Sequence, residues 1–283
     1  MSEMNIPKTY KLFIGGAFPR SESGRSREVR NLAGKFVANI ALASRKDARE
    51  AVVAARTAQA AWSSATAYNR GQVIYRIAEV LDGRFEQFVA TIRAATGATP
   101  KQASAQVQSA IDTLIYHAGW TDKFAQVYGG ANPVAGPFFN LTVPEPTGVV
   151  SVLAGEQTDF ADLIRAIVSV IATGNAVVAV VPTGVSLAAI EFAEVLATSD
   201  VPVGTVNILT GDASEIAPWL ASHQDVNGLD LSSLEAELAT NCEELGAETL
   251  KRILRKSDKG LTDLQRLEAF VEAKTVWHTK SLS

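Results

Sequence analysis

The sequence predicts an α/β protein built on a doubly wound parallel sheet, and three observations lead to this prediction. From Thr147 onward, short apolar runs alternate with helical segments of roughly ten to fourteen residues, the pattern of strands buried on both faces. Hydrophobic residues make up 47% of the 283 residues, an ordinary globular share that excludes disorder for most of the chain. No uncharged apolar stretch of about 18 residues occurs, so we expect no membrane span.

The first half of the chain is predicted to be mainly helical after a peripheral strand. A short β-type run at residues 10–14 leads into a polar loop that extends to Arg30. Ser44 stands three residues before Asp47, which predicts the capped start of an amphipathic helix. The helical spacing of apolar residues predicts three helices, at residues 44–62, 68–95 and 103–124.

A segment rich in proline and glycine separates the two halves. Residues 128–146 hold four prolines and three glycines, a density that no helix tolerates. We therefore expect an extended connection or an edge hairpin there.

The second half is predicted to alternate between strands and helices. The predicted strands are residues 148–154, 176–181, 205–209 and 228–231, and the predicted helices are residues 160–172, 186–197 and 213–222. Residues 232–255 are acidic at their start and basic at their end, as suits the dipole of a single helix. A short helix at 262–268 and a strand-like tail at 269–277 complete the chain.

The composition indicates the cellular compartment and excludes one class of binding partner. The chain has 26 Lys and Arg against 30 Asp and Glu, a net charge of -4, so we expect no nucleic-acid partner. Cys242 is the single cysteine, which excludes an intramolecular disulfide and fits a reducing cytoplasm. The first residues lack a basic segment followed by an apolar core, so we expect no signal peptide and a cytoplasmic protein.

A doubly wound sheet binds ligands at the carboxyl ends of its strands. The loops at that edge are residues 154–159, 182–186, 210–213 and 231–234, and none contains a dinucleotide or Walker motif. Cys242 falls on the apolar face of its predicted helix, which favours an inert buried thiol over a nucleophile. The three histidines are isolated in the sequence, so we expect no metal site.

One basic cluster remains, and it has two interpretations. It consists of Lys251, Arg252, Arg255, Lys256 and Lys259. A solvated helix end is the simpler interpretation, and a phosphate-binding patch is the alternative.

Several segments resemble the amino-terminal half of aldehyde dehydrogenases. They are Tyr-Lys-Leu-Phe-Ile-Gly-Gly from Tyr10, the helix that starts after Ser44 and ends near Trp62, Ala-Gly-Trp from Ala118, Pro-Glu-Pro-Thr-Gly-Val-Val from Pro144, Ala-Thr-Gly-Asn-Ala-Val-Val from Ala172, and the segment from Asp200 to Gly211. The similarity is collinear over about residues 8–231, and the tail at 270–277 resembles the carboxyl-terminal strand of the family. The chain is therefore identified as a member of this superfamily, which implies a Rossmann-like sheet with an extended oligomerisation arm.

The resemblance also shows which functional positions have changed. Gln157 stands at the position of the family's oxyanion-hole asparagine, and Val180 and Thr183 stand where lysine and glutamate hold the cofactor ribose. Ser232 begins the segment that replaces the family's glycine-rich turn, and neither the nucleophilic cysteine nor the general-base segment has a counterpart. Weak cofactor positions therefore remain at Thr183, Gly211 and Ser232, and no catalytic residue is identified beyond the altered Gln157.

The resemblance implies a domain arrangement and a function. We expect a dinucleotide-binding-type domain at residues 1–127 and 148–260, an arm at residues 128–147 and 261–283, and no catalytic domain. Such a chain would be a non-catalytic structural or regulatory subunit that assembles with a full-length aldehyde dehydrogenase and binds NAD(P) weakly or not at all. The alternatives are an active NAD(P)-dependent oxidoreductase acting on aldehydes and a vestigial homo-oligomer that binds a nucleotide or another small anion.

Overall fold

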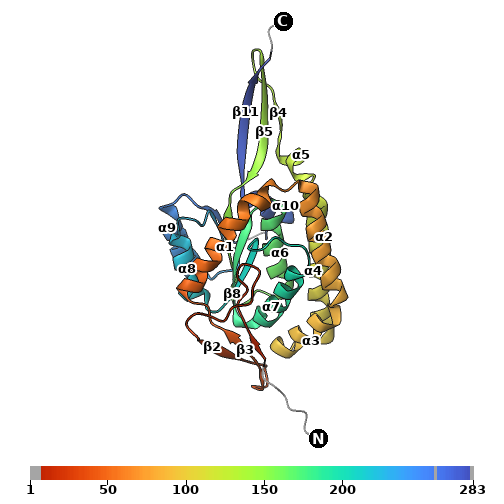
Figure 1. Cartoon of the computed structure of the whole chain (residues 1–283), viewed down its shortest axis with the longest axis vertical. Coiled ribbons are helices and arrows are strands. Elements are labelled where there is room, and N and C mark those ends of the chain that lie inside the picture. Colours follow the sequence, from red (N-terminus) through yellow and green to blue (C-terminus); the bar gives the residue numbers. More distant parts are fainter. Residues whose placement is uncertain (1–7, 258–259, 281–283) are drawn as a thin grey trace.

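A five-stranded parallel sheet forms the centre of the protein (Figure 1). The computed structural model describes residues 8–257 and 260–280. The sheet has the strand order β10-β9-β6-β7-β8, and its strands are β6 (Val149–Leu153), β7 (Ala176–Val181), β8 (Val206–Thr210), β9 (Gly228–Asp230) and β10 (Arg252–Leu254). The predicted α/β class with a parallel sheet is confirmed.

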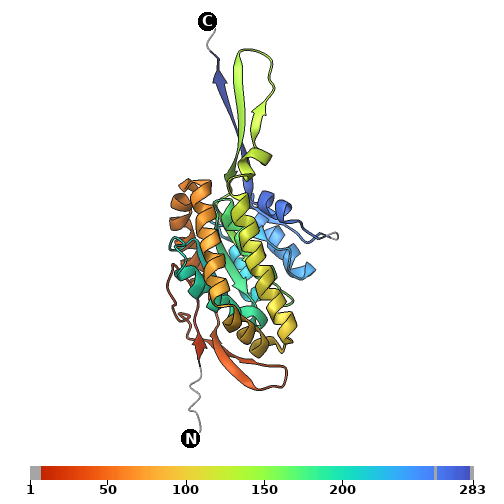
Figure 2. The same ribbon diagram turned by 90° about the vertical axis from the view of Figure 1, so that its right-hand side faces the viewer.

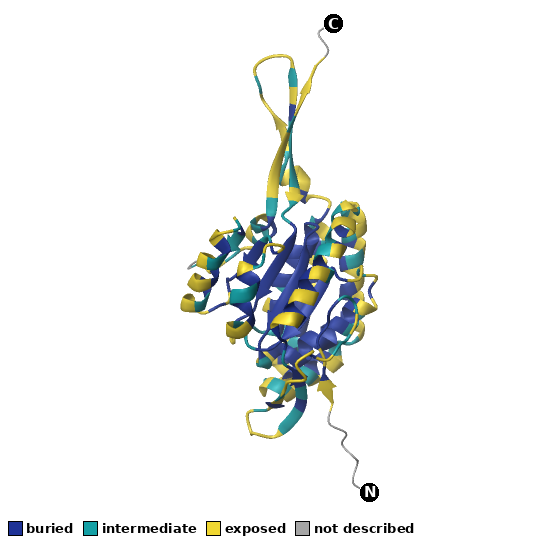
Figure 3. Cartoon of the chain, turned by 60° about the vertical axis from the view of Figure 1, so that its left-hand side comes forward, coloured by how far each residue is buried: buried dark blue, intermediate teal, exposed yellow. Residues whose placement is uncertain are grey.

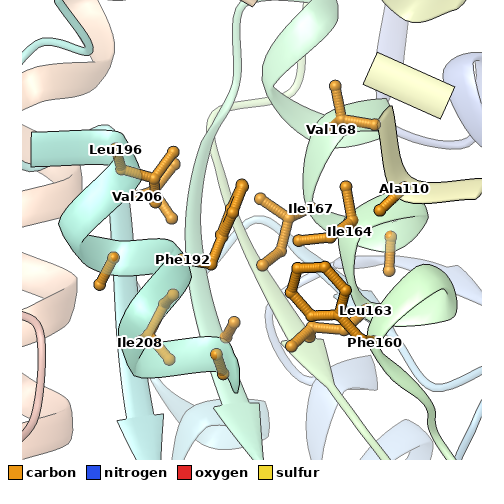
Figure 4. Packing of buried hydrophobic residues seen from close by; sticks show 14 of the residues in the cluster. Ala110, Phe160, Leu163, Ile164, Ile167, Val168, Phe192, Leu196, Val206 and Ile208 are labelled. Atoms are coloured by element: carbon orange, nitrogen blue, oxygen red, sulfur yellow. The ribbon is translucent and has the colours of Figure 1, made fainter. Parts of the chain in front are cut away.

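The apolar residues of the strands pack into two hydrophobic cores, one on each face of the sheet. Val178 and Val180 of β7 pack on one face with helices α1 (Arg45–Ser64), α8 (Ala213–Ser222) and α9 (Ala236–Ala247). On the other face, the alternate residues of β7 and β8 meet α6 (Phe160–Ala172) and α7 (Thr183–Ala197), where Phe160 and Phe192 fill the space beside Ile167 (Figure 4). Figure 3 shows the strands as a buried layer between helices with exposed outer sides.

The outer helical layer differs from the sequence prediction at two places. The expected helix at 68–95 is two helices, α2 (Ala67–Gly83) and α3 (Phe85–Thr96), because Arg84 leaves the helical conformation with φ -112° and ψ 15°. The expected helix at 103–124 is α4 (Pro100–Trp120) followed by the short α5 (Phe124–Tyr128). The capping box of Thr99 and Gln102 starts α4 three residues earlier than the apolar spacing suggested.

The polar loop expected up to residue 30 is partly a strand. A small sheet with the order β1-β3-β2 contains β1 (Thr9–Tyr10), β2 (Ser26–Arg30) and β3 (Phe36–Ala41). The residues of β2 are mostly polar because this edge strand has few buried positions, so its sequence lacks the apolar signal of a core strand.

The prediction of one helix over residues 232–255 is wrong. Helix α9 ends at Ala247, Leu250 adopts a positive φ of 54°, and the chain then forms β10 in parallel register with β9. The charge asymmetry suited a helix dipole, but the Ile253-Leu254 pair completes the sheet instead.

A three-stranded antiparallel arm projects from the domain (Figure 2). Its central strand β5 (Phe138–Pro146) pairs with β4 (Gly130–Asn132) on one side and with β11 (Val271–Thr279) on the other. Helix α10 (Asp263–Ala269) connects the domain to β11. The arm therefore joins two segments that are more than 120 residues apart in the sequence, as shown by the ion pair between Lys274 and Glu145 with a separation of 129.

Candidate functional site

The strand order identifies where a ligand site would lie. The chain passes from β6 to β7 and β8 on one side and then crosses to β9 and β10 on the other, so the order reverses between β6 and β9. Ligands of doubly wound sheets bind in the crevice at such a reversal. A cavity of about 280 Å³ lies there, and its lining includes Gln157, Ser233, Arg255 and Lys256.

The crevice between the loop after β6 and the loop after β9 is narrow. A side chain at Gly155 would collide with the backbone carbonyl of Ser233, so the loops after β6 and β9 are in close backbone contact. Gln157 is exposed and also lines a second cavity, of about 240 Å³, between α3 and the starts of α6 and α7. The structure therefore places Gln157 at the edge of the candidate crevice.

Ser232 lies at the carboxyl end of β9, but its polar groups have internal partners. Its hydroxyl donates to Oδ1 of Asp230 at 2.6 Å, and its amide donates to the same oxygen at 2.9 Å. Arg266 of α10 lies 3.3 Å from the other carboxylate oxygen of Asp230. The Ser232 hydroxyl is thus part of a buried polar network and is turned away from the solvent.

Thr183 and Gly211 follow the neighbouring strands β7 and β8, and Arg27 of β2 contacts Thr183 and Asp212, the residue after Gly211. Arg27 of β2 donates to the two carboxylate oxygens of Asp212 at 2.8 and 2.7 Å and to the hydroxyl of Thr183 at 3.4 Å. The hydrogen bonds from Arg27 hold the pKa of Asp212 below its ordinary value. Gly211 donates its amide to the carbonyl of Val181, which keeps this loop against the sheet.

Two further residues named in the sequence prediction lie in the core. Val180 is fully buried within β7, and its side chain packs in an apolar core. Cys242 is fully buried in α9, and burial raises the pKa of its thiol to about 11, so the thiol is protonated at neutral pH. A buried, protonated thiol is a poor nucleophile.

The basic cluster does not form a helix end. Lys251 is buried and donates to the carbonyls of His223 and Val226, Arg252 pairs with Glu272 of the arm, and Arg255 lies 3.3 Å from Glu243. Lys256 is exposed at the 280 Å³ cavity, and Lys259 lies outside the described residues.

The sequence prediction did not find Arg255 and Lys256 as neighbours of Gln157. Only the addition of β10 to the sheet brings them to the reversal point. The one local signal is the short apolar pair Ile253-Leu254 between charged residues.

Three further features of the described residues concern metal binding, membrane insertion and a second region of the surface. In the described part of the chain, no group of three or more His, Cys, Asp or Glu side chains could hold a metal ion. Nor is any described helix both long and apolar enough to cross a membrane. A separate cavity of about 920 Å³ is lined mainly by α2 and α4 and includes no residue of the loops at the carboxyl edge of the sheet.

Comparisons with known proteins agree on the ancestry of the chain. The family model described as the aldehyde dehydrogenase family matches residues 18–253. Cytosolic 10-formyltetrahydrofolate dehydrogenases of Mus musculus and Homo sapiens are each 32% identical over 235 residues, which cover 80% of this chain and 26% of theirs. The chain therefore spans about a quarter of the length of these curated relatives.

Solved structures show the same fold. An NAD-dependent aldehyde dehydrogenase from Sinorhizobium meliloti superposes with a TM-score of 0.81 and 24% identity, over 88% of this chain and 50% of that one. A betaine aldehyde dehydrogenase from Staphylococcus aureus, solved with NAD+, gives a TM-score of 0.79 and 23% identity, over 86% of this chain and 50% of that one.

Proposed function

Because this chain belongs to the aldehyde dehydrogenase family, we propose that it is a non-catalytic structural or regulatory subunit, cytoplasmic, that assembles with a full-length aldehyde dehydrogenase. One observation carries the proposal. Only residues 255–262 connect β10 to α10, so the chain passes from the last strand of the sheet to the arm without an intervening catalytic domain. The family resemblance would place a catalytic domain at this point, so the short connection from β10 to α10 supports a chain without one.

The chemistry of the remaining residues supports a non-catalytic role. Aldehyde oxidation through a thiohemiacetal needs a thiolate, an oxyanion hole and a base. The only thiol, Cys242, is buried and protonated, and Gln157 replaces the oxyanion-hole asparagine with a longer side chain.

The residues at the carboxyl edge fit a nicotinamide dinucleotide poorly. Thr183 and Val180 offer no charged group to the ribose hydroxyls, and the Ser232 hydroxyl is already bonded to Asp230. The loops after β6 and β9 leave a cavity of about 280 Å³, just below the range of about 300–1,000 Å³ that is usual for ligand pockets. We therefore expect NAD(P) to bind only weakly.

The arm supports assembly through its free edge. In the part of the chain that the structure describes, β11 is the terminal strand of the arm sheet and pairs only with β5. Trp277 is 58% exposed and Phe139 is 45% exposed, so the arm carries large apolar side chains into solvent. An unpaired strand edge with exposed aromatic residues favours strand addition to a partner sheet.

Co-expression with the full-length homologue from the same genome tests assembly. The wild-type chain should be retained by the tagged homologue, and a variant lacking residues 271–283 should not, because it has lost the edge strand. This truncation keeps Phe270, which is buried at the arm root. Leu32→Ser, at an exposed position in the turn between β2 and β3, is the matched control and should retain binding.

The same co-expression experiment would also reveal a homo-oligomer that does not bind the homologue. If the wild-type and truncated chains have the same homodimer mass and neither is retained by the homologue, assembly with a homologue through the arm is refuted. The chain would then be a homo-oligomer held together by other surfaces.

Cofactor binding has its own test. The charged partners that Val180 and Thr183 replace would each contribute about 1.5–3 kcal/mol, so NAD should bind roughly two to four orders of magnitude more weakly than it would with both present. Titration calorimetry should give a dissociation constant above the micromolar range. A micromolar constant together with aldehyde-dependent NADH formation would instead establish an active oxidoreductase, as the NAD+ complex of the Staphylococcus aureus relative would suggest.

A further inference from the structure

Asp230 and Arg266 form an ion pair across the carboxyl edge of the sheet. They lie 36 residues apart in the sequence, one at the end of β9 and the other in α10. The Asp230 side chain is only 3% exposed and that of Arg266 is 16% exposed. This pair is therefore among the least exposed ion pairs of the described residues.

Ser232 completes a three-residue clamp with this pair. Asp230 uses one carboxylate oxygen to accept from the Ser232 amide and hydroxyl, and the other lies 3.3 Å from Nη1 of Arg266. Nη1 also lies 3.5 Å from the Ser232 hydroxyl. Both oxygens of the Asp230 carboxylate thus have partners. Because Ser232 fixes the carboxylate, the carboxylate in turn orients the guanidinium of Arg266.

Helix α10 carries the arm, which makes its position important. Phe270, the residue after α10, is buried, and its carbonyl accepts from the Asn175 side chain at 2.8 Å and from the Thr147 amide at 3.2 Å. Strand β11 starts at the next residue. Figure 1 shows α10 at the base of the arm, so a shift of α10 would move the strand that leaves it.

We infer that the clamp of Asp230, Ser232 and Arg266 positions the root of the arm. The family resemblance implies a dinucleotide site at the carboxyl edge of the sheet. In this chain, residues at that edge instead fix the base of the arm. The clamp acts within a single chain and does not depend on the proposed function. Only its importance for partner binding rests on the proposal that the arm binds a partner.

The energetics of buried ion pairs favour positioning over simple stabilisation. Removing two charges from water offsets most of their attraction, so a buried pair adds little net stability when correctly formed. Breaking one partner leaves an uncompensated buried charge, which strongly disfavours misplaced arrangements. Such a pair selects one position of α10 against others.

Hydrogen exchange of the isolated chain tests this role. Arg266→Met removes the guanidinium, and we expect the amides of α10 and of the first residues of β11 to exchange at least about tenfold faster, while β6 and β7 keep their relative protection. Arg266→Lys retains the charge and should restore part of the protection. Arg84→Met is the control, because it removes a partly buried ion pair with Glu194 that lies away from the arm.

The outcomes separate this inference from the proposed function. If Arg266→Met accelerates all amides equally, or leaves α10 and β11 unchanged, the clamp does not position the arm. If the exchange effect is found but the wild-type chain does not retain the full-length homologue, the clamp stands and the assembly proposal fails. If both hold, Arg266→Met should also weaken retention of the homologue at equal amounts of folded protein.

Discussion

His117 is wholly buried in α4 and has one unpartnered ring nitrogen. Its Nδ1 donates to the Thr113 carbonyl at 2.8 Å, while Nε2 has no hydrogen-bond partner. Burial lowers the pKa of His117 below its ordinary value of 6.5, and the charges of Asp263, Arg165 and Arg266 act on it as well. Burial therefore favours the neutral imidazole in the folded protein.

The stability of the fold should consequently fall in mild acid. As the pH falls through about 6.5, the unfolded chain binds a proton at His117 more readily than the folded chain, so the free energy of unfolding decreases as the pH drops. His117→Gln should remove this component, which amounts to at most about 1.4 kcal/mol per pH unit. Urea unfolding between pH 5 and pH 7 measures it, with His278→Gln on the exposed arm as control. Equal pH slopes for wild type and His117→Gln would exclude this role.

At the scale of single elements, the start of α1 shows how local sequence and tertiary contacts combine. Ser44 and Asp47 form the capping box that their spacing predicted. The Asp47 carboxylate accepts from the Ser44 amide at 2.7 Å and also from the Ser21 hydroxyl at 2.7 Å and the Glu22 amide at 3.1 Å. The cap therefore also fastens the loop before β2 to the helix.

Asp47→Ala should destabilise the protein more than the loss of an ordinary cap. The substitution removes the shared acceptor of three donors, two of them in buried surroundings, and should lower the free energy of unfolding by about 2–3 kcal/mol. Chemical denaturation measures the change. Asp82→Ala, at an exposed position of α2, should change stability by less than about 0.5 kcal/mol, and a similar loss in both variants would contradict the assignment.

At the scale of the whole molecule, the arm and the domain depend on each other little. Strand β11 makes its main contacts with β5 of the arm, and most of its residues are exposed. The two cores on the faces of the sheet contain only Val271 from β11, as a partly buried neighbour. The arm is thus an attachment to a domain that has its own core.

Removal of residues 271–283 should leave this domain folded. The truncated chain loses the Arg252–Glu272 ion pair and the pairing with β5, but it keeps both cores, so its melting temperature should fall by only about a few degrees. Calorimetry and circular dichroism measure this. A truncated chain without a cooperative transition would show that the arm is part of the folding unit.

The sequence by itself determined the class of the fold and most of its elements. Apolar runs at β6, β7 and β8 are long enough to indicate strands buried on both faces, and caps such as Ser44 act within a few residues of the helix they start. The changes at Gln157 and Thr183 were also visible, because they concern residue types at positions that a family resemblance aligns.

Only the tertiary structure decided how the carboxyl edge is used. Strand β10 is three residues long and gains its stability from pairing with β9, a contact that local sequence does not encode. Arg27 covers Thr183, and Arg266 meets Asp230, through separations of 156 and 36 residues. Contacts of this kind depend on where distant elements pack, and the local sequence does not determine how those elements are placed.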